Sequence, residues 1–405
     1  MNRQPFEKPP QWWSPKPSPW WIRFWRPLRK RNQLKLQRLL QIDVRGHQHV
    51  RQAIADNLGL LITPNHASHA DCFATYAAAD AVGIPFCIMV AWQVFGRSSW
   101  LKRLALRHHG CFSVDREGTD VQAFRQAVEV LEAGPYPLVV FPEGEVYHVN
   151  DRITPFREGP AAMALLAARK GRRPIICIPC ALKYRYLEDP TPALLPLMDR
   201  LERAIFWRPR PDLTLPERIY HFAEGILALK EIEFFGRSCE GPLPRRVAGL
   251  IDFILNGLEA RHGLDLPAST VPERVKALRR HFIARLEELP QGDPGRQPCE
   301  EGLEDVFLAV QLFSYPGDYV AEQPSIERMA ETLDKFEEDV LGVETATIRA
   351  ARAATVTFGE PIPVSAERAK SAAAVLTRLL EERVQALLSE KEISAGGQPE
   401  RAAAG

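Results

Sequence analysis

The stretch TPNHASHADCF places two imidazoles and a carboxylate within six residues of one another. A carboxylate five positions after an imidazole, as in His66 and Asp71, can accept a hydrogen bond from one ring nitrogen across a strand-to-helix turn. That contact fixes the tautomer, stabilises the imidazolium and leaves the other nitrogen to act as a general base. Taken alone, the spacing also fits a metal site completed by His69 with help from His108 or His109, or a structural turn. We favour the base pair, because His69 begins a helix and need not face His66.

Two further groups suit the binding of a substrate. In VVFPEGEVY, Gly144 permits a tight turn whose amide groups face a ligand, and Glu143 can hold a hydroxyl or order a loop. In GCFSVDRE, Arg116 carries a planar fork of donors that matches phosphate oxygens. Each group by itself is also compatible with an ordinary turn or a surface arginine.

These groups all follow short apolar runs of the kind that buried strands make. The predicted strands are 58–63, 85–91, 110–114, 137–141 and 174–180. Helical patterns separate them, and the clearest runs from Asp120 to Gly134. The alternation predicts an α/β domain with a mostly parallel sheet flanked by helices. Open α/β sheets bind ligands at the carboxyl ends of their strands, so the three groups should lie together there.

The strand–helix alternation stops near residue 189 and strand patterns return at 353–364. Five helices are predicted in between, at 218–235, 244–261, 271–288, 301–313 and 324–341. The expected organisation is an arm (1–44), the main α/β domain (45–189), a mainly helical insertion (190–345), the last strand and helix of the domain (346–390) and a disordered tail (391–405).

Composition excludes several classes of protein. A net charge of +1 over 405 residues gives no argument for nucleic acid as a partner. An odd number of cysteines, 7, without framework spacing indicates a reducing compartment, and Cys177 and Cys180 are expected to be core thiols. No apolar run is long enough for a spanning helix, and we expect no signal peptide. The phosphate-binding glycine motifs of nucleotide sites do not occur.

The N-terminal arm has a composition of its own. Residues 1–38 hold five of the eight tryptophans, ten basic residues and one acid. Tryptophans and cations favour a membrane interface, although the tryptophans could equally dock on the protein's own core. As a helix, residues 20–31 would place Trp21, Trp25 and Leu28 on one face. The opposite face would carry Arg23, Arg26 and Lys30.

Taken together and in this order, the motifs resemble those of the glycerolipid acyltransferase family, the glycerol-3-phosphate and 1-acylglycerol-3-phosphate O-acyltransferases. The family's His-x-x-x-x-Asp motif falls on His66 and Asp71, and its arginine motif on Gly110, Phe112 and Arg116. The third motif falls on Phe141, Pro142, Glu143 and Gly144. CIPCALKY occupies the place of the fourth motif, and VTFGEP resembles the closing strand. The resemblance covers 45–188 and 353–388.

The resemblance implies a mechanism and a set of partners. His66, paired with Asp71, takes the proton of an acceptor hydroxyl, whose oxygen attacks an acyl thioester without a covalent acyl-enzyme, a metal or another cofactor. The donor is acyl-CoA or acyl carrier protein. The acceptor is a glycerolipid such as 1-acylglycerol-3-phosphate, met by a cytoplasmic enzyme held peripherally at the membrane. The implied substrate-binding residues are Asn65, Arg116, Phe141, Pro142, Glu143 and Gly144.

The third motif departs from the family pattern. The family commonly has Thr-Arg-Ser after Phe-Pro-Glu-Gly, where this chain has Glu145, Val146 and Tyr147. A phosphate-binding arginine is missing, and Arg157 is a candidate to replace it, unless it is a solvated side chain. Two alternatives therefore stay open: acylation of a non-glycerolipid alcohol or amine, and a non-catalytic lipid-binding protein of the same fold. The intact His66 argues against the latter.

Overall fold

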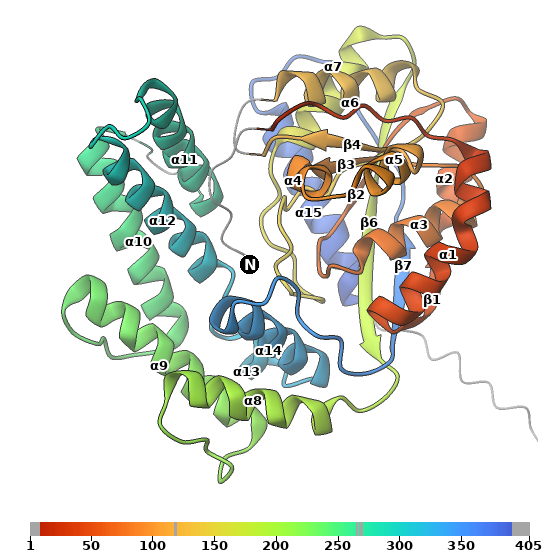
Figure 1. The fold of residues 1–405 in the computed structure, drawn as a ribbon. Helices are drawn as coiled ribbons and strands as arrows, with labels where there is room; N and C mark the ends of the chain where they lie inside the picture. Colours follow the sequence, from red (N-terminus) through yellow and green to blue (C-terminus); the bar gives the residue numbers. More distant parts are fainter. Residues whose placement is uncertain (1–8, 117–119, 265, 267–269, 391–405) are drawn as a thin grey trace, which may run out of the picture.

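The computed structural model describes residues 9–116, 120–264, 266 and 270–390. Figure 1 shows an α/β domain beside a lobe of helices. The strands are β1 (Leu39–Arg45), β2 (Gly59–Pro64), β3 (Cys87–Ala91), β4 (Cys111–Val114), β5 (Leu138–Val139), β6 (Ile175–Tyr186), β7 (Arg352–Phe358) and β8 (Ile362–Pro363). Their order is β1-β7-β6-β2-β5-β3-β4, with β8 beside β6. All pairs are parallel except those of β6 with β7 and β8. The predicted fold class is confirmed.

Each face of the sheet carries its own apolar core. Leu60 and Ile62 of β2 belong to one core and Leu61 to the other, because successive side chains of a strand point to opposite faces. The helices over the first core are α2 (His47–Ala55) and α3 (Asp71–Val82). Those over the second are α6 (Val121–Ala133), α7 (Gly159–Lys170) and α15 (Ala372–Ser389). Cover on both faces explains why the strands read as continuous apolar runs.

The beginning of the described chain packs on the α/β domain. The buried ring of Trp13 stacks on Phe95, with centroids 5.3 Å apart, and the backbone N–H of Trp13 donates to Oγ of Ser113 at 2.9 Å. Residues 39–44, which we expected to belong to the arm, form most of β1 and pair with β7. This boundary was wrong because β1 is an edge strand in which only Leu39 is buried, so it makes no apolar run.

Within the arm, α1 (Pro19–Gln37) directs other side chains toward the protein than we expected. The ring of Trp21 packs against His108 at the end of α5 (Trp100–His108), with centroids 5.0 Å apart. Arg26 pairs with Asp80 of α3 at 2.9 Å. Both residues therefore face the protein, because an ion pair and a ring contact anchor this side of the helix. The outward side carries Trp20, Phe24, Trp25 and Leu28.

The helical lobe follows β6 and ends before β7. Its elements are α8 (Thr191–Ile205), α9 (Leu215–Phe235), α10 (Leu243–His262), α11 (Val271–Glu288), α12 (Arg296–Phe313), α13 (Tyr319–Glu322) and α14 (Ile326–Leu341). The helix α8 was not predicted, because its segment is rich in proline. Pro192 stands in its first turn, where proline costs nothing, and only Pro196 lies inside it.

Two apolar clusters hold the lobe together, one among α9–α12 and one among α8, α9 and α14. The helix α14 also contacts β6, so it is the part of the lobe nearest the sheet (Figure 1). No helix in the described part of the chain combines the length and apolarity needed to cross a bilayer. The tail expected to be disordered, 391–405, lies outside the described residues.

Candidate active site

His66 and Asp71 lie where β2 ends and α3 begins. Nδ1 of the imidazole is 2.7 Å from Oδ2 of the carboxylate. The Asp71 side chain is buried, whereas that of His66 is 23% exposed. Within the described part of the chain, Nε2 of His66 has no hydrogen-bond partner. A histidine oriented by a carboxylate at one nitrogen and accessible at the other can act as a general base.

Three groups hold the Asp71 carboxylate in place. The N–H of Ser68 donates to Oδ2 at 3.1 Å, and the hydroxyl of Tyr184, on β6, donates to Oδ1 at 2.6 Å. The carboxylate also stands in the first turn of α3, where the helix dipole favours a negative charge. Burial, together with the charge of Asp71, raises the pKa of Tyr184 far above its usual value, so its hydroxyl remains a donor.

Asn65 and Glu143 hold the backbone around the histidine. The amide of Asn65 is buried and exchanges two hydrogen bonds with the backbone of Leu182 on β6, at 3.0 and 2.7 Å. Oε1 of Glu143 accepts from the N–H of His66 at 2.7 Å, and Oε2 accepts from the N–H and hydroxyl of Thr154. Burial raises the pKa of Glu143. Of the two roles expected for Glu143, this arrangement fits the ordering of loops.

The Phe-Pro-Glu-Gly turn brings the histidine and two arginines to one place. The ring of Phe141 packs against that of His66, with centroids 4.3 Å apart. Gly144 has a φ of 80°, and a Cβ there would come within 2.6 Å of Nε of Arg157. The backbone N–H of Arg157 donates to the carbonyl of the buried Pro142 at 2.9 Å. Glycine is therefore required both by the backbone and by the guanidinium against it.

Arg116 already has an acidic partner at this turn. Its Nη1 donates to the carbonyl of Gly144 at 2.7 Å and lies 2.7 Å from Oε2 of Glu145. Burial would raise the pKa of Glu145, but the charges of Arg116 and Arg157 outweigh it and lower that pKa. Glu145, the acid that replaces the family's usual residue, is thus the ion-pair partner of Arg116, which we expected to bind phosphate.

The histidines of the alternative metal set are separated. Nε2 of His69 lies 3.1 Å from Oε1 of Glu338 in α14, away from Asp71. Nδ1 of His109 bonds the carbonyl of Ala105 within α5. Among the described residues, the combination of His66 with these side chains does not form a cluster of metal-ligand spacing.

The chain was compared with known proteins. Residues 41–183 match the family model described as Acyltransferase. Residues 41–183 therefore form a domain of the glycerolipid acyltransferase family, which supports an acyltransferase activity. The match begins inside β1 and ends inside β6, so it includes both turns of the site. The comparison with curated proteins gives no match.

Sequence reasoning missed the hydroxyl that supports the carboxylate. Tyr184 lies 113 residues after Asp71, on a strand whose pairing with β2 only the fold reveals. The available signal was its place in CIPCALKY, the fourth motif, where it shares a face with Cys180 and Leu182.

Proposed function

We propose that this protein transfers a fatty acyl group from a thioester donor, acyl-CoA or acyl carrier protein, to a hydroxyl of a glycerolipid acceptor. The observation that carries the proposal is the pair of His66 and the buried Asp71 at the carboxyl end of β2, with Tyr184 on the second carboxylate oxygen. Burying an ionised acid is costly, and here the buried carboxylate is held by Ser68 and Tyr184 in contact with the imidazole of His66.

In the proposed reaction, Nε2 of His66 accepts the proton of the acceptor hydroxyl as its oxygen attacks the thioester carbonyl. The C–O bond forms, the C–S bond breaks, and the imidazolium returns its proton to the leaving thiolate. Asp71 holds the ring in the right tautomer and stabilises its transient charge. General-base assistance of this kind typically contributes about 10²–10⁴ in rate.

The first candidate acceptor is 1-acylglycerol-3-phosphate. Arg116 and Arg157 both lie at the Phe-Pro-Glu-Gly turn, and the positive charges of both guanidiniums act on the carboxylate of Glu145. A phosphate would bind there by taking the position of Glu145 next to Arg116. This supports a phosphorylated acceptor without requiring the arginine that the third motif lacks.

A second candidate is an acceptor without phosphate, and the 2.7 Å pair of Arg116 with Glu145 favours it. Because Glu145 already neutralises Arg116, an anionic ligand would gain less binding free energy from this arginine. A hydroxyl-bearing or amine-bearing lipid would then bind beside the intact pair. The same His66 would act on either acceptor.

One assay distinguishes these candidates. Thiol release from acyl-CoA by the purified protein is measured with 1-acylglycerol-3-phosphate and with the matching 1-acylglycerol. A higher kcat/KM for the phosphorylated lipid supports the first candidate, and a lower one supports the second. Glu145→Gln removes the internal carboxylate beside Arg116. The ratio of the two kcat/KM values should therefore shift toward the phosphorylated lipid by about tenfold, which corresponds to about 1.4 kcal/mol. Absence of acceptor-dependent thiol release with any hydroxyl lipid, from either donor, would refute the proposed activity.

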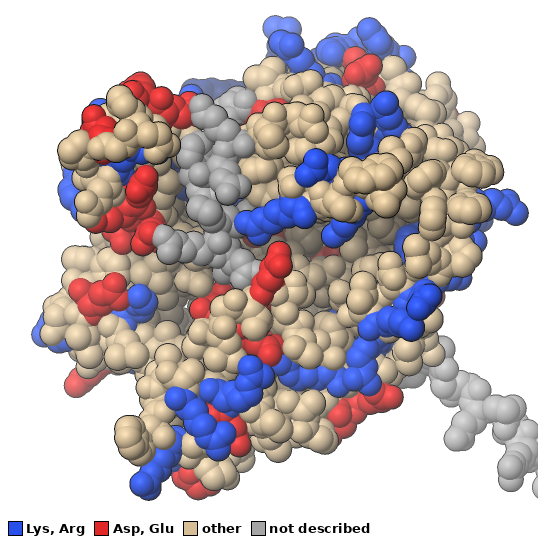
Figure 2. Space-filling model, viewed as in Figure 1, with Lys and Arg blue, Asp and Glu red and all other residues tan. Residues whose placement is uncertain are grey.

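We also propose peripheral attachment to the cytoplasmic face of a membrane through α1. Its outward side exposes Trp20 and Phe24, at 69% and 59%, and basic side chains border it. Figure 2 shows many Lys and Arg side chains on the α/β side of this view. Aromatic anchors with cations beside them suit an anionic lipid surface.

Vesicle sedimentation tests this attachment. The double variant Trp20→Ala/Phe24→Ala should bind phosphatidylserine-containing vesicles at least about tenfold more weakly, and wild-type binding should weaken as salt rises. Trp13→Ala is the matched control, since its ring is buried against Phe95 and its loss should lower the melting temperature instead. Unchanged binding by the double variant would place the lipid contact elsewhere.

A further inference from the structure

Two histidines and a glutamate from three distant segments meet beside the active site. His69 precedes α3, His148 follows the Phe-Pro-Glu-Gly turn, and Glu338 stands on α14 of the helical lobe. Nε2 of His69 is 3.1 Å from Oε1 of Glu338, and Nε2 of His148 is 3.2 Å from Oε2. One ligand atom from each residue lies within 4.8 Å of the other two.

The spacing of these atoms suits a single ion. Zn²⁺ binds imidazole nitrogen and carboxylate oxygen at about 2.0–2.2 Å, which separates neighbouring ligands of a tetrahedral ion by about 3.3 Å. Each imidazole lies about that far from its own carboxylate oxygen of Glu338: Nε2 of His69 is 3.1 Å from Oε1, and Nε2 of His148 is 3.2 Å from Oε2. These distances are also longer than the roughly 2.7–2.9 Å that is usual for a charge-assisted hydrogen bond between such groups.

The chemical state of the groups fits the same role. Burial lowers the pKa of His148 in spite of its hydrogen bond to Glu338, which favours the neutral imidazole that a metal binds. Burial would raise the pKa of Glu338, but the hydrogen bonds from His148 and His69 lower it far below its usual value. Glu338 therefore offers a carboxylate oxygen to each of the two imidazoles.

The surroundings hold the groups in this arrangement. His148 has a φ of 51°, a left-handed conformation that costs a non-glycine residue energy, and this backbone carries its side chain toward α14. The N–H of Ala346 donates to Oε1 of Glu338 at 3.1 Å, an outer contact of the kind that orients metal-binding carboxylates. Neither contact is needed by the proposed acyl transfer.

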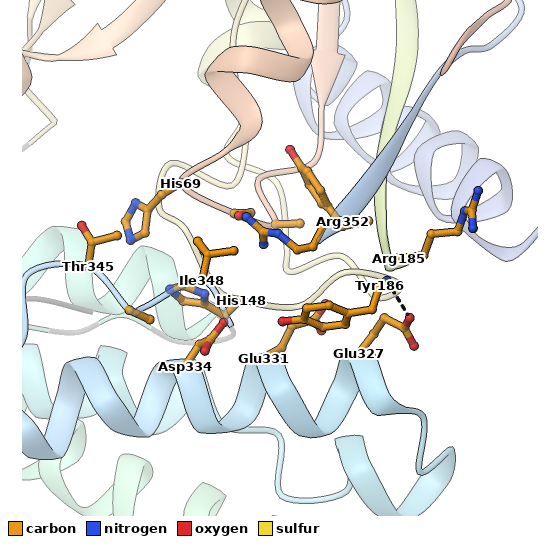
Figure 3. A pocket seen from close by; sticks show the side chains of 14 residues that line it. His69, His148, Arg185, Tyr186, Glu327, Glu331, Asp334, Thr345, Ile348 and Arg352 are labelled. Atoms are coloured by element: carbon orange, nitrogen blue, oxygen red, sulfur yellow. Dashed lines mark hydrogen bonds between the residues drawn. The ribbon is translucent and has the colours of Figure 1, made fainter. Parts of the chain in front are cut away.

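Space for a further ligand lies next to the cluster. Figure 3 shows His69 and His148 at one end of a cavity between α14 and the strand ends, beside Thr345 and Ile348. Its volume is about 30 Å³, which admits a water molecule. Three protein ligands with room for water form the set that zinc sites with an open position use.

We propose that His69, His148 and Glu338 form a binding site for a divalent transition metal, with Zn²⁺ as the preferred ion. The ion would join the catalytic turn and the loop after Glu143 to the helical lobe. Mg²⁺ and Ca²⁺ are not expected there, because they prefer oxygen ligands. The site lies apart from the catalytic pair of His66 and Asp71 and does not depend on the acyltransferase proposal.

The test is metal binding by the full chain, independent of activity. The protein is stripped with EDTA and titrated with Zn²⁺ in competition with a chelating dye. We expect one equivalent to bind, the melting temperature to rise with Zn²⁺, and Mg²⁺ to have no effect. Fe²⁺ should bind more weakly than Zn²⁺.

Variants then locate the ion. His69→Ala, at a half-exposed position that should tolerate truncation, and Glu338→Gln should each weaken Zn²⁺ binding by more than about 100-fold, since even outer contacts of a metal site cost 10–100-fold. His281→Ala is the matched control, because its 3.2 Å contact with His262 is a histidine pair without a carboxylate. Circular dichroism checks the fold of each variant.

Two results would overturn the proposal. One is the absence of Zn²⁺ binding by the folded wild-type protein, which would leave Glu338 as a hydrogen-bond acceptor of His69, His148 and Ala346. The other is tight binding that persists in folded His69→Ala or that disappears in His281→Ala. Neither result would bear on whether His66 catalyses acyl transfer, which the thiol-release assay measures.

Discussion

The turn after β2 and the turn after β5 lie at the same edge of the sheet, yet they are organised in opposite ways. In the first, the contacts of Asp71 with Ser68 and Tyr184 all serve to direct one carboxylate at His66. At the second, Glu145 is paired with Arg116, which follows β4 and is the charged group expected to receive a ligand. Under the proposed mechanism, the reactive group would be complete before substrate binds, whereas recognition of the acceptor would depend on exchanging or keeping an internal ion pair.

The largest expected effect concerns the first turn. His66→Ala should lower acyl transfer by about 10³-fold or more, and Asp71→Asn by a similar order, because the base and its orientation are lost. Thiol release under saturating acceptor measures the effect. His49→Ala is the matched control, since His49 is another histidine 3.6 Å from an acid, Glu360, on the same domain. Equal damage by the control, or retained activity in His66→Ala, would contradict the comparison.

The second turn should respond in binding more than in turnover. Arg116→Ala should raise the KM of a phosphorylated acceptor by about 10–100-fold and change the KM of acyl-CoA little, because a charged hydrogen bond contributes about 1.5–3 kcal/mol. Arg116→Lys should recover part of the loss, since a point charge lacks the planar fork. The two KM values, measured side by side, decide the matter. An equal rise in both would show that Arg116 does not read the acceptor.

A smaller effect sharpens the account of the first turn. Tyr184→Phe removes the 2.6 Å hydrogen bond to Asp71 while keeping the ring in its core. We expect kcat to fall about tenfold and the acceptor KM to stay unchanged, because the carboxylate loses one of its supports but not its contact with His66. If kcat falls as far as in His66→Ala with the fold intact, Tyr184 has a direct role in the chemistry.

The smallest expected effect concerns β6, the strand that carries Cys177 and Tyr184. Burial raises the pKa of Cys177, on β6, to about 12, so almost no thiolate exists at pH 7. Iodoacetamide should therefore leave Cys177 unmodified in the folded protein and label it in urea, as mass spectrometry of the peptides would show. Labelling of the native protein would mean that β6 opens, and that the register holding Tyr184 against Asp71 is less secure than the comparison assumes.

The sequence was sufficient for elements whose pattern is local. The buried strands before His66, Arg116 and Glu143 were found because cover on both faces leaves only apolar residues in them. The contact between His66 and Asp71 could be predicted because five residues across one turn is a local arrangement, whereas its catalytic role stays a prediction. The edge strand β1 and the proline-containing α8 were missed because neither has a distinctive run of its own.

The remainder depended on contacts between distant segments. Glu338 lies 269 residues after His69, on a helix that was predicted but could not be placed against the sheet. The partner of Arg116 was visible as an unusual acid in the third motif, but its pairing required the geometry of the turn around Gly144. The spacing of residues in the sequence can indicate a pair such as His66 and Asp71. It does not tell which side chains from distant segments contact that pair or neutralise an arginine such as Arg116.

The antiparallel pairing of β6 with β7 has a consequence for the architecture of the chain. Tyr186 at the end of β6 is the register partner of Arg352 at the start of β7, and Leu187 still donates to the carbonyl of Ala351 at 2.8 Å. The whole helical lobe thus occupies the position of a hairpin loop, and a two-residue Asn-Gly turn could join the same two strands. Because loop-closure entropy grows only logarithmically with length, a hairpin can carry so long an excursion at modest cost to the sheet. The lobe accordingly leaves and rejoins the sheet at neighbouring residues, so its two connections to the α/β domain lie side by side.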